Sequence, residues 1–366
     1  MSPLDQDYGT AIILQGGGAL GAYELGVLRA LYETRPGFKP SIVTGISIGA
    51  ITAAVLAGAK GDPIRALDRL WREKLTVVPT LPFFPSEYQR FVSAFVPKEL
   101  EKHLSAWGNP GMYRPRLDYV YAPWLRTSVY DLEPLRQTLT EMVDLEKLNN
   151  GGIRVAVGAT NVATSEIKYF DNDKVLLSIE DVMASGSLPP GFPMTKVNGD
   201  YYWDGGLFEN TPLSPALNRL EELDKEKREL VVVELFPQQS QIPDDMADVI
   251  NRMLQLQYTN RLKLDAKFFE KFNSFIGLLE EIDKTVDKDH PIRKTEGYRE
   301  LREYKRIDAA SVIRAHLPPE LSNASDFSKA SIEERIDDGY RDAIEQNIGE
   351  YTPAEKEVAK LTEGRS

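Results

Sequence analysis

"SIVTGISIGAITAAVLAGA", residues 41–59, gives the strongest indication of the fold in this sequence. Its opening residues are apolar and predict a short buried strand, and the small apolar residues after Ser47 predict a helix. Between them lies Gly45-x-Ser47-x-Gly49, the G-x-S-x-G pattern at a strand-to-helix turn. In that context the pattern predicts a nucleophile elbow. The glycines let the backbone turn sharply, and the serine hydroxyl projects beside the positive end of a helix.

A glycine-rich segment upstream has the same strand-to-helix character. "IILQGGGALGAYELG", residues 12–26, contains the frame Gly16-x-Gly18-x-x-Gly21, which fits the dinucleotide fingerprint of a Rossmann unit. Consecutive glycines can instead point backbone N–H groups at a developing oxyanion. A Rossmann unit needs an acidic residue at the end of its second strand, and this chain has Ser47 there. The pattern therefore favours an oxyanion hole, with a nicotinamide dinucleotide-binding oxidoreductase as the weaker alternative.

The alternation of predicted strands and helices indicates an α/β fold with a mainly parallel sheet. Further strands are predicted for "GIRVAVGATNV" (152–162), "LVVVELF" (230–236) and "AASVIRAHL" (309–317). Capping-box spacing predicts that helices begin at Ser178 and at Ser331.

After Pro237, apolar residues three or four apart predict a long amphipathic helix over about residues 249–282. Its apolar stripe indicates a core-facing helix, with a dimer interface or a membrane-surface helix as alternatives. The chain thus divides into a catalytic domain over 8–237 and a mostly helical C-terminal extension over 238–366.

Composition narrows the class of protein. A net charge of −12 argues against nucleic acid as a partner, because such binding relies on clustered Lys and Arg. The chain has no cysteine, which excludes disulfides, thiolate metal sites and a Cys nucleophile. The N-terminal residues do not resemble a secretory signal, and no apolar run approaches the ~18 residues of a membrane span. We expect a soluble, cytoplasmic protein that uses no cofactor or metal.

Residues 79–126 interrupt the α/β pattern and look like an insertion rich in proline and aromatic residues. Because Tyr and Trp favour a membrane interface, the insertion is a candidate for acyl-chain binding or peripheral membrane contact. A loop-rich cap packed on the core remains an equal alternative. Its aromatic residues are Phe83, Phe84, Tyr88, Phe91, Phe95, Trp107, Tyr113, Tyr119, Tyr121 and Trp124.

A serine nucleophile needs a base, and the sequence offers four candidates. Three are the histidines of the chain, His103, His290 and His316, none of which lies in a motif. The fourth is Asp204 in "YYWDGGLFEN", where an apolar aromatic run delivers a carboxylate to a Gly-Gly turn. Most Asp-Gly-Gly triplets are only turns, so the signal from this one depends on the other motifs.

The three motifs, in this order, resemble the patatin-like phospholipase family, and "MASGSLPPGFP" (183–193) is similar to the family's segment between nucleophile and aspartate. The resemblance covers about residues 8–237, and the C-terminal part is similar to an extension of one bacterial subgroup. It implies a three-layer α/β/α fold with a mainly parallel sheet. It also implies a Ser–Asp dyad without a catalytic histidine. The motif residues are Gly16, Gly17, Gly18, Gly21, Gly45, Ser47, Gly49, Asp204, Gly205 and Gly206.

On that resemblance Ser47 is the nucleophile, Asp204 the general base, and Gly16, Gly17 and Gly18 the oxyanion hole, with Ile48 N–H as an additional donor. We therefore expect a lipid acyl hydrolase that works through an acyl-enzyme. A carboxylesterase or thioesterase with the same dyad is the nearest alternative, and a catalytically silent lipid-binding protein is a third. Many family members carry Arg or Lys where this chain has Leu20, which weakens the expectation of a phospholipid substrate more than that of hydrolysis.

Overall fold

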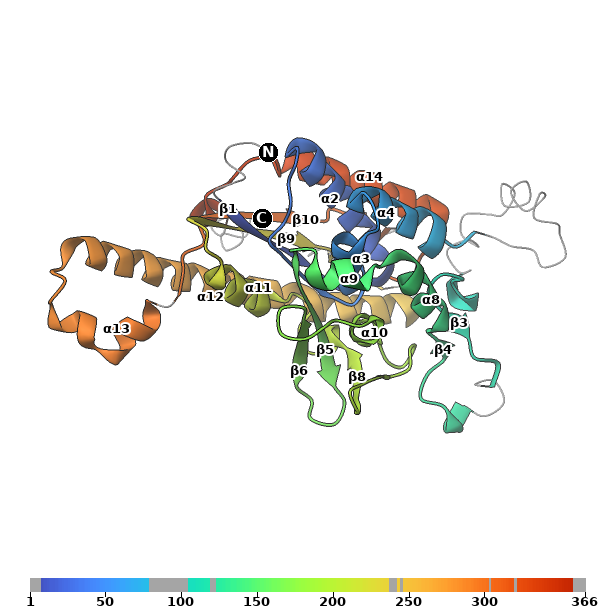
Figure 1. Ribbon diagram of the computed structural model, residues 1–366. Helices are drawn as coiled ribbons and strands as arrows, with labels where there is room; N and C mark the ends of the chain where they lie inside the picture. The colour runs from blue at the N-terminus through green and yellow to red at the C-terminus, as the bar shows by residue number, and fades with distance from the viewer. Residues whose placement is uncertain are drawn as a thin grey trace.

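A large sheet lies between layers of helices in the computed structural model (Figure 1). Its strands follow the order β10-β9-β1-β2-β5-β8-β7, and β6 pairs with β5. This arrangement is the predicted three-layer α/β/α fold. The structure describes residues 8–78, 105–118, 123–236, 242–243, 246–302, 304–318 and 321–357.

Five strands form the parallel part of the sheet, which the sequence predicts. They are β1 (Tyr8–Leu14), β2 (Ile42–Ile46), β5 (Arg154–Asn161), β9 (Lys227–Glu234) and β10 (Ala309–Arg314). Antiparallel pairs add β6 (Ile167–Asp171), β7 (Thr195–Val197) and β8 (Asp200–Asp204). A separate two-stranded ribbon joins β3 (Arg114–Pro115) and β4 (Tyr130–Asp131).

The helices cover both faces of this sheet. They are α2 (Ala22–Thr34), α3 (Ile48–Gly58), α4 (Pro63–Arg69), α8 (Glu133–Met142), α9 (Leu145–Asn150), α10 (Ile179–Ser185), α11 (Leu213–Glu222), α12 (Met246–Thr285), α13 (Glu296–Leu301) and α14 (Lys329–Glu345). Short helical turns lie at η1 (Gly18–Gly21), η2 (Leu70–Leu75), η3 (Ser105–Trp107), η4 (Pro123–Leu125), η5 (Gly205–Leu207) and η6 (Pro291–Lys294).

The two predicted capping boxes have different outcomes. Ser178 caps α10 and exchanges hydrogen bonds with Asp181, as predicted. The prediction for Ser331 is wrong, because α14 already begins at Lys329. The Ser331 hydroxyl instead donates to the Asp326 carboxylate.

Alternation along β1 explains why the sheet is covered on both sides. Ile12 and Leu14 belong to the larger core cluster, with residues of α2, α3 and α14. Ala11 and Ile13 point to the other face and join a smaller cluster with residues of α11. Since successive side chains of a strand point to opposite faces, a strand with buried side chains on both faces such as β1 is suited to the middle of three layers.

Residues of the C-terminal extension complete this fold. Strand β10 pairs in parallel with β9 at the edge of the sheet. Helix α14 crosses α2 so closely that a Cβ on Gly26 would lie 2.0 Å from the Ile336 carbonyl oxygen, and one on Gly339 would lie 2.2 Å from that of Tyr23. The division of the chain at residue 237 stays a prediction from the sequence, but parts of both segments share one core.

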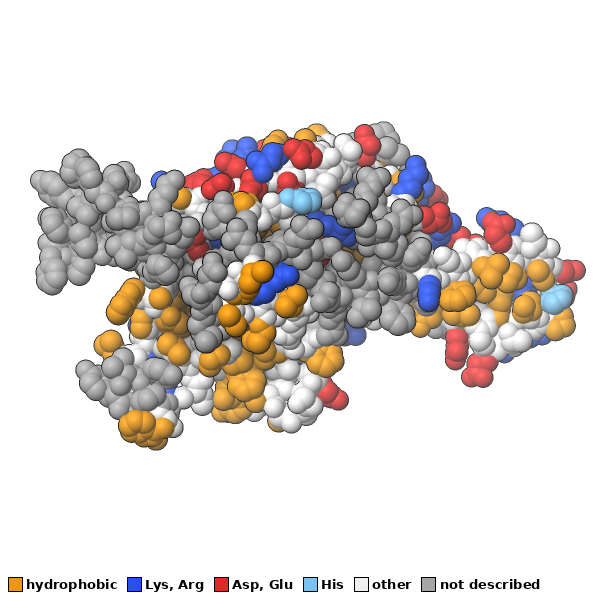
Figure 2. Space-filling view, turned by 180° about the vertical axis from the view of Figure 1, so that it is seen from behind, with side chains coloured by type: hydrophobic (Ala, Val, Ile, Leu, Met, Phe, Trp, Pro, Cys, Tyr) orange, Lys and Arg blue, Asp and Glu red, His pale blue; other side chains and the backbone are white. Residues whose placement is uncertain are grey.

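The predicted long helix exists as α12, without interruption. Its buried side chains include Tyr258 and Ile276, whereas Val249, Met253, Leu256 and Phe275 of the predicted apolar stripe are exposed. The core assignment is therefore wrong for these four residues. Apolar side chains also lie along the projecting α12–α13 segment (Figure 2). Among the described helices, none is long and apolar enough to span a bilayer.

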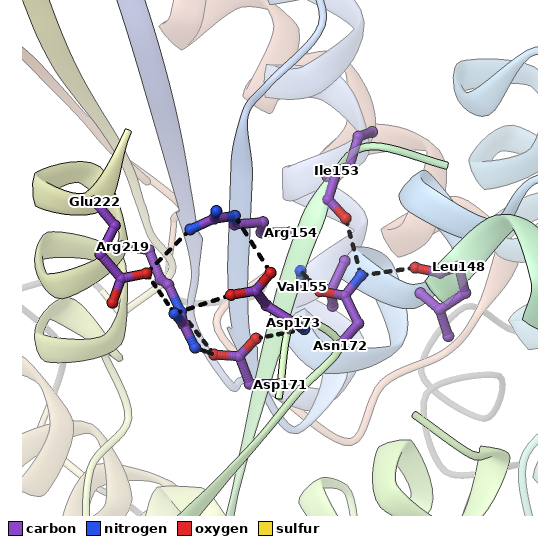
Figure 3. Close-up of polar contacts among 9 residues, drawn as sticks. All are labelled: Leu148, Ile153, Arg154, Val155, Asp171, Asn172, Asp173, Arg219 and Glu222. Carbon is purple, nitrogen blue, oxygen red and sulfur yellow. Dashed lines mark hydrogen bonds and ion pairs between the residues drawn. The ribbon is translucent and has the colours of Figure 1, made fainter. Parts of the chain in front are cut away.

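A polar network ties the β5–β6 hairpin to α11 (Figure 3). The buried Arg219 guanidinium contacts Asp171, Asp173 and Glu222, and the Asn172 side chain bonds to the backbone of residues 148, 153 and 155. This network lies at the start of β5, which is the opposite edge of the sheet from the end of β2. It fixes α11, whose first turn directly follows the segment from Asp204 to Pro212.

The insertion is only partly described. Residues 79–104 and 119–122 lie outside the described part of the chain. They include His103 and seven of the ten aromatic residues that the insertion contributes to the predicted lipid contact. Of the three that are described, Tyr113 is buried and packs against Tyr130, Phe192 and Phe327. Trp107 and Trp124 are 82% and 78% exposed. The described residues thus show one aromatic packed on the core and two presented to the surface.

Candidate active site

Three strand ends bring the predicted motifs to the same edge of the sheet. Leu14 of β1 lies beside Gly45 of β2, so the glycine loop and Ser47 follow neighbouring parallel strands. Ile46 lies beside Gly158 of β5, and the next residue, Ala159, pairs with Asp204 at the end of β8. The register of β5 therefore joins the serine and the aspartate.

Ser47 has the backbone of a strained elbow. Its φ of 55° and ψ of −121° lie outside the regions that a residue with a side chain ordinarily adopts. The two motif glycines make room for this turn, because a Cβ on Gly45 would lie 2.3 Å from the Gly49 carbonyl oxygen and one on Gly49 would lie 2.4 Å from that of Leu14. Strain of this kind persists only where the surrounding structure holds it.

Asp204 is a buried carboxylate, 2% exposed, that lies close enough to the Ser47 side chain to interact with it. Burial raises the pKa of Asp204 to about 7, although the interaction with Ser47 and the hydrogen bond from the Gly206 N–H lower it. The Gly206 N–H donates to Oδ1 at 2.8 Å. A base whose pKa lies near neutrality is well matched to proton transfer at physiological pH.

The backbone of Asp204 is fixed on both sides. Its N–H donates to the Ser187 carbonyl at 3.0 Å, and its carbonyl accepts from the Thr160 hydroxyl at 3.1 Å. Gly205 passes close to β5, since a Cβ there would lie 2.4 Å from the Gly158 carbonyl oxygen. The turn after β8 therefore holds the carboxylate in one place.

The glycine loop lies against the serine. A Cβ on Gly16 would lie 2.9 Å from Cβ of Ser47, and a Cβ on Gly21 would meet the Ile48 side chain at 2.7 Å. Within the described residues, the N–H groups of Gly17, Gly18 and Ile48 donate to no other atom. The site thus combines a hydroxyl, a buried carboxylate and three available N–H donors.

The histidine candidates do not join this site. His290 accepts a hydrogen bond from the Ile292 N–H through Nδ1, and His316 lies beside Asp342 and is largely exposed. His103 lies outside the described residues. Among the described candidates, only Asp204 contacts Ser47.

Several residues of the site carried no signal that the sequence alone could interpret. Asn210 donates from Nδ2 to the Gly16 carbonyl at 3.0 Å, and its Oδ1 lies 3.1 Å from where a Cβ on Gly206 would be. Asn210 thereby connects the glycine loop to the aspartate turn. Ser185, in the segment of residues 183–193, accepts from the Ser47 N–H at 3.0 Å.

The C-terminal extension also contributes to the site. Tyr258 of α12 is buried against Phe236, and its hydroxyl lies 3.3 Å from where a Cβ on Gly206 would be. Burial and the charge of Asp204 raise the pKa of Tyr258, so its hydroxyl stays protonated. Nothing in the sequence around Tyr258 distinguishes it from the other residues of an amphipathic helix.

A cation does contact the glycine loop, although position 20 holds a buried leucine. The guanidinium of Arg335 on α14 is fully buried and donates to the carbonyl of Ala19 at 3.4 Å. It also donates to the carbonyls of Leu321, Asn323 and Asp326. Burial lowers the pKa of Arg335 to about 10, and it still carries a charge at neutral pH.

A family model described as patatin-like phospholipase matches residues 12–217, which is more than half of the chain. The chain belongs to the patatin-like phospholipase family. This membership confirms the family that the ordered motifs predict, and it gives the matched domain its class, a lipid acyl hydrolase. The matched range contains the glycine loop, Ser47 and Asp204 of this patatin-like domain. A comparison with curated proteins finds no match.

Two solved structures resemble the patatin-like chain. VipD from Legionella pneumophila is 17% identical, with a TM-score of 0.40, over 93% of this chain and 66% of VipD. The heterodimeric ExoU–SpcU complex from the type III secretion system of Pseudomonas aeruginosa contains a chain that is 14% identical, with a TM-score of 0.34, over 98% of this chain and 58% of that one. The chain therefore spans 58–66% of the length of these two proteins.

Proposed function

We propose that this chain hydrolyses fatty acyl esters of lipids, phospholipids among them, through a Ser47–Asp204 dyad and an acyl-enzyme. The observation that carries the proposal is the strand register that brings Ser47 and the buried Asp204 carboxylate together, at the end of strands that also deliver the glycine loop. The family match supports the same chemistry.

In the first half of the proposed reaction, Asp204 takes the proton of the Ser47 hydroxyl as Oγ attacks the ester carbonyl. The N–H groups of the loop Gly16–Gly18, chiefly those of Gly17 and Gly18, stabilise the oxyanion, and Ile48 N–H adds a donor. Each such donor contributes about 3 kcal/mol to lowering the barrier. The tetrahedral intermediate collapses as the ester C–O bond breaks, and the alcohol leaves with the proton from Asp204.

In the second half, Asp204 accepts a proton from water as the water oxygen attacks the acyl-enzyme. The bond between the acyl carbon and Ser47 Oγ then breaks, the fatty acid leaves, and the proton returns to Ser47. One carboxylate therefore serves both steps, which requires that it can give up and take a proton near the working pH.

Exposed apolar side chains in the described part of the insertion support a peripheral contact with membranes. Trp107, Leu117, Trp124 and Leu125, all in the described part of the insertion, are each at least 70% exposed. The same segment carries Arg114, Arg116 and Arg126, of which Arg114 and Arg126 pair with Asp131 and Asp118. Exposed tryptophan in a segment that also carries arginine is suited to an anionic lipid surface.

Labelling with a fluorophosphonate, followed by mass mapping, tests the nucleophile directly. We expect a single adduct on Ser47 in the wild type, and none in Ser47→Ala. Ser47→Ala and Asp204→Asn should fold normally and lose hydrolysis of a medium-chain p-nitrophenyl ester. Full activity in either variant would contradict the dyad.

A substrate panel then separates the lipid hydrolase from its alternatives. A preference for long acyl chains presented in vesicles supports a lipid acyl hydrolase. Equal or better turnover of short soluble esters or of acyl thioesters would instead indicate a carboxylesterase or a thioesterase with the same dyad.

A further inference from the structure

Ser185 is the last residue of α10 and is fully buried. Its hydroxyl oxygen accepts a hydrogen bond from the Ser47 N–H at 3.0 Å and donates to the Gly158 carbonyl at 2.6 Å. Gly158 belongs to β5, the strand that pairs with both β2 and β8. A single hydroxyl therefore connects the backbone of Ser47 to β5, the strand whose Ala159 pairs with Asp204.

The hydrogen bond from Ser47 to Ser185 acts at the most strained position of the site. The peptide group that ends in the Ser47 N–H fixes φ of Ser47, which is 55°. A residue held at such an angle relaxes unless its neighbours prevent it, and the direction of its side chain changes as it does so. Without Ser185 Oγ the N–H would also lose its acceptor, which itself is unfavourable in a buried setting.

The same turn holds the other member of the dyad. Two residues after Ser185, the Ser187 carbonyl accepts the Asp204 N–H at 3.0 Å. The Ser187 hydroxyl points elsewhere and bonds to the Met183 carbonyl and the Thr195 hydroxyl. The end of α10 thus contacts the backbones of Ser47 and Asp204 at once.

We propose that Ser185 is a positioning residue for the dyad, holding the strained backbone of Ser47 so that its hydroxyl stays within reach of the Asp204 carboxylate. The inference deepens the proposed function and rests on it. Ser185 touches neither substrate nor reacting atoms, and its effect passes through Ser47. Misplacement of a nucleophile by as little as about 1 Å can lower a rate by about 100-fold.

Ser185→Ala tests this, with Thr138→Val on α8 as the control for loss of a buried hydroxyl. The Thr138 side chain is buried and its hydroxyl donates to the Gly111 carbonyl at 2.7 Å, outside the dyad, so both variants lose a buried hydrogen-bonding hydroxyl and should lose thermal stability. Only Ser185→Ala should lower kcat on a soluble ester, by at least about tenfold, with KM changed by less than about twofold. The rate of fluorophosphonate labelling should fall in parallel.

The pH profile provides a readout that lost stability alone would not move. The interaction with Ser47 lowers the pKa of Asp204, so loosening it should shift the acid limb of kcat/KM to higher pH in Ser185→Ala. In Thr138→Val the limb should stay where it is in the wild type. Equal loss of kcat in both variants, or wild-type kcat in Ser185→Ala, would overturn the inference.

Ser185→Cys keeps the test open if the alanine variant fails to fold. A thiol has nearly the same shape but is a weak hydrogen-bond partner, so kcat should still fall and the acid limb should still shift. Wild-type values of both in Ser185→Cys would overturn the proposal. Absence of Ser47 labelling in the wild type is a separate result, which would contradict the proposed function.

Discussion

The Ala19 N–H donates a hydrogen bond of 2.8 Å to the carbonyl oxygen of Ala324. The first of these residues lies in the glycine loop, and the second lies in the C-terminal extension. Arg335 donates to the Ala19 carbonyl, so the extension binds both peptide groups that flank Ala19. The proposed oxyanion hole therefore depends on residues from both ends of the chain.

Gly18→Ala should damage the glycine loop. Gly18 has a φ of +54°, and a Cβ there would lie 2.5 Å from the Ala324 carbonyl oxygen. We expect a loss of stability of about 1–3 kcal/mol, and a fall in kcat of about 100-fold as the N–H donors move. Gly61→Ala is the control, because its Cβ would meet nothing within 4 Å. Urea unfolding and ester kinetics measure both effects, and wild-type kcat in Gly18→Ala would contradict the oxyanion assignment.

Arg335→Met should destabilise the protein by more than about 3 kcal/mol. The substitution leaves several buried carbonyl groups without a donor, including those of Asn323 and Asp326. Because the segment around Ala324 then loses its anchor, kcat should fall as well. Arg65→Met on the exposed side of α4 is the control for loss of a positive charge. An unchanged urea midpoint in Arg335→Met would contradict this account.

The rate of hydrolysis should rise with pH through neutrality. Asp204 has to be ionised to accept the Ser47 proton, and its pKa is raised to about 7. We expect kcat/KM on a soluble ester to fall about tenfold per pH unit below that value and to reach a plateau above it. An acid limb near pH 4, the ordinary range of an aspartate, would show that Asp204 is not the base that titrates.

Asp204→Asn should stabilise the folded protein at neutral and alkaline pH. The carboxyl binds its proton more tightly in the folded state than in the unfolded state, so wild-type stability decreases as pH rises from about 4 to 7. The difference in free energy of unfolding between Asp204→Asn and wild type should grow over that range to at most about 4 kcal/mol. Denaturant titrations at pH 5 and pH 8 measure it, and a larger gain at pH 5 would contradict the burial argument.

Replacing Trp107 and Trp124 by serine should weaken membrane contact. Each exposed indole that enters a bilayer interface contributes enough apolar burial for about a tenfold change in affinity. Binding to vesicles that contain anionic lipid, and hydrolysis in them, should fall while turnover of a short soluble ester stays unchanged. Leu176→Ser is the control, because Leu176 is equally exposed but follows β6 at the edge of the sheet opposite Ser47. Equal losses on both substrates would count against an interfacial role.

Much of the site could be predicted because its motifs are local. The strand, the glycines and Ser47 occur within one short segment, and the strand-to-helix turn at Ser47 was predicted correctly from it. The apolar stripe of α12 was harder, because periodicity shows that a helix has two faces but not which face has a partner. The pattern therefore could not separate Val249 and Met253, which are exposed, from Tyr258, which is buried beside Asp204.

The fold class, the family and the order of the three motifs could be predicted from short segments of the chain. The distant groups that hold those motifs are visible only in three dimensions: Ser185 bound to the Ser47 backbone, Asn210 bound to the glycine loop, and Ala324 with Arg335 from the extension. These contacts carry no local pattern. They arise from the register of the strands and the packing of α10 and α14, which no short stretch of sequence specifies.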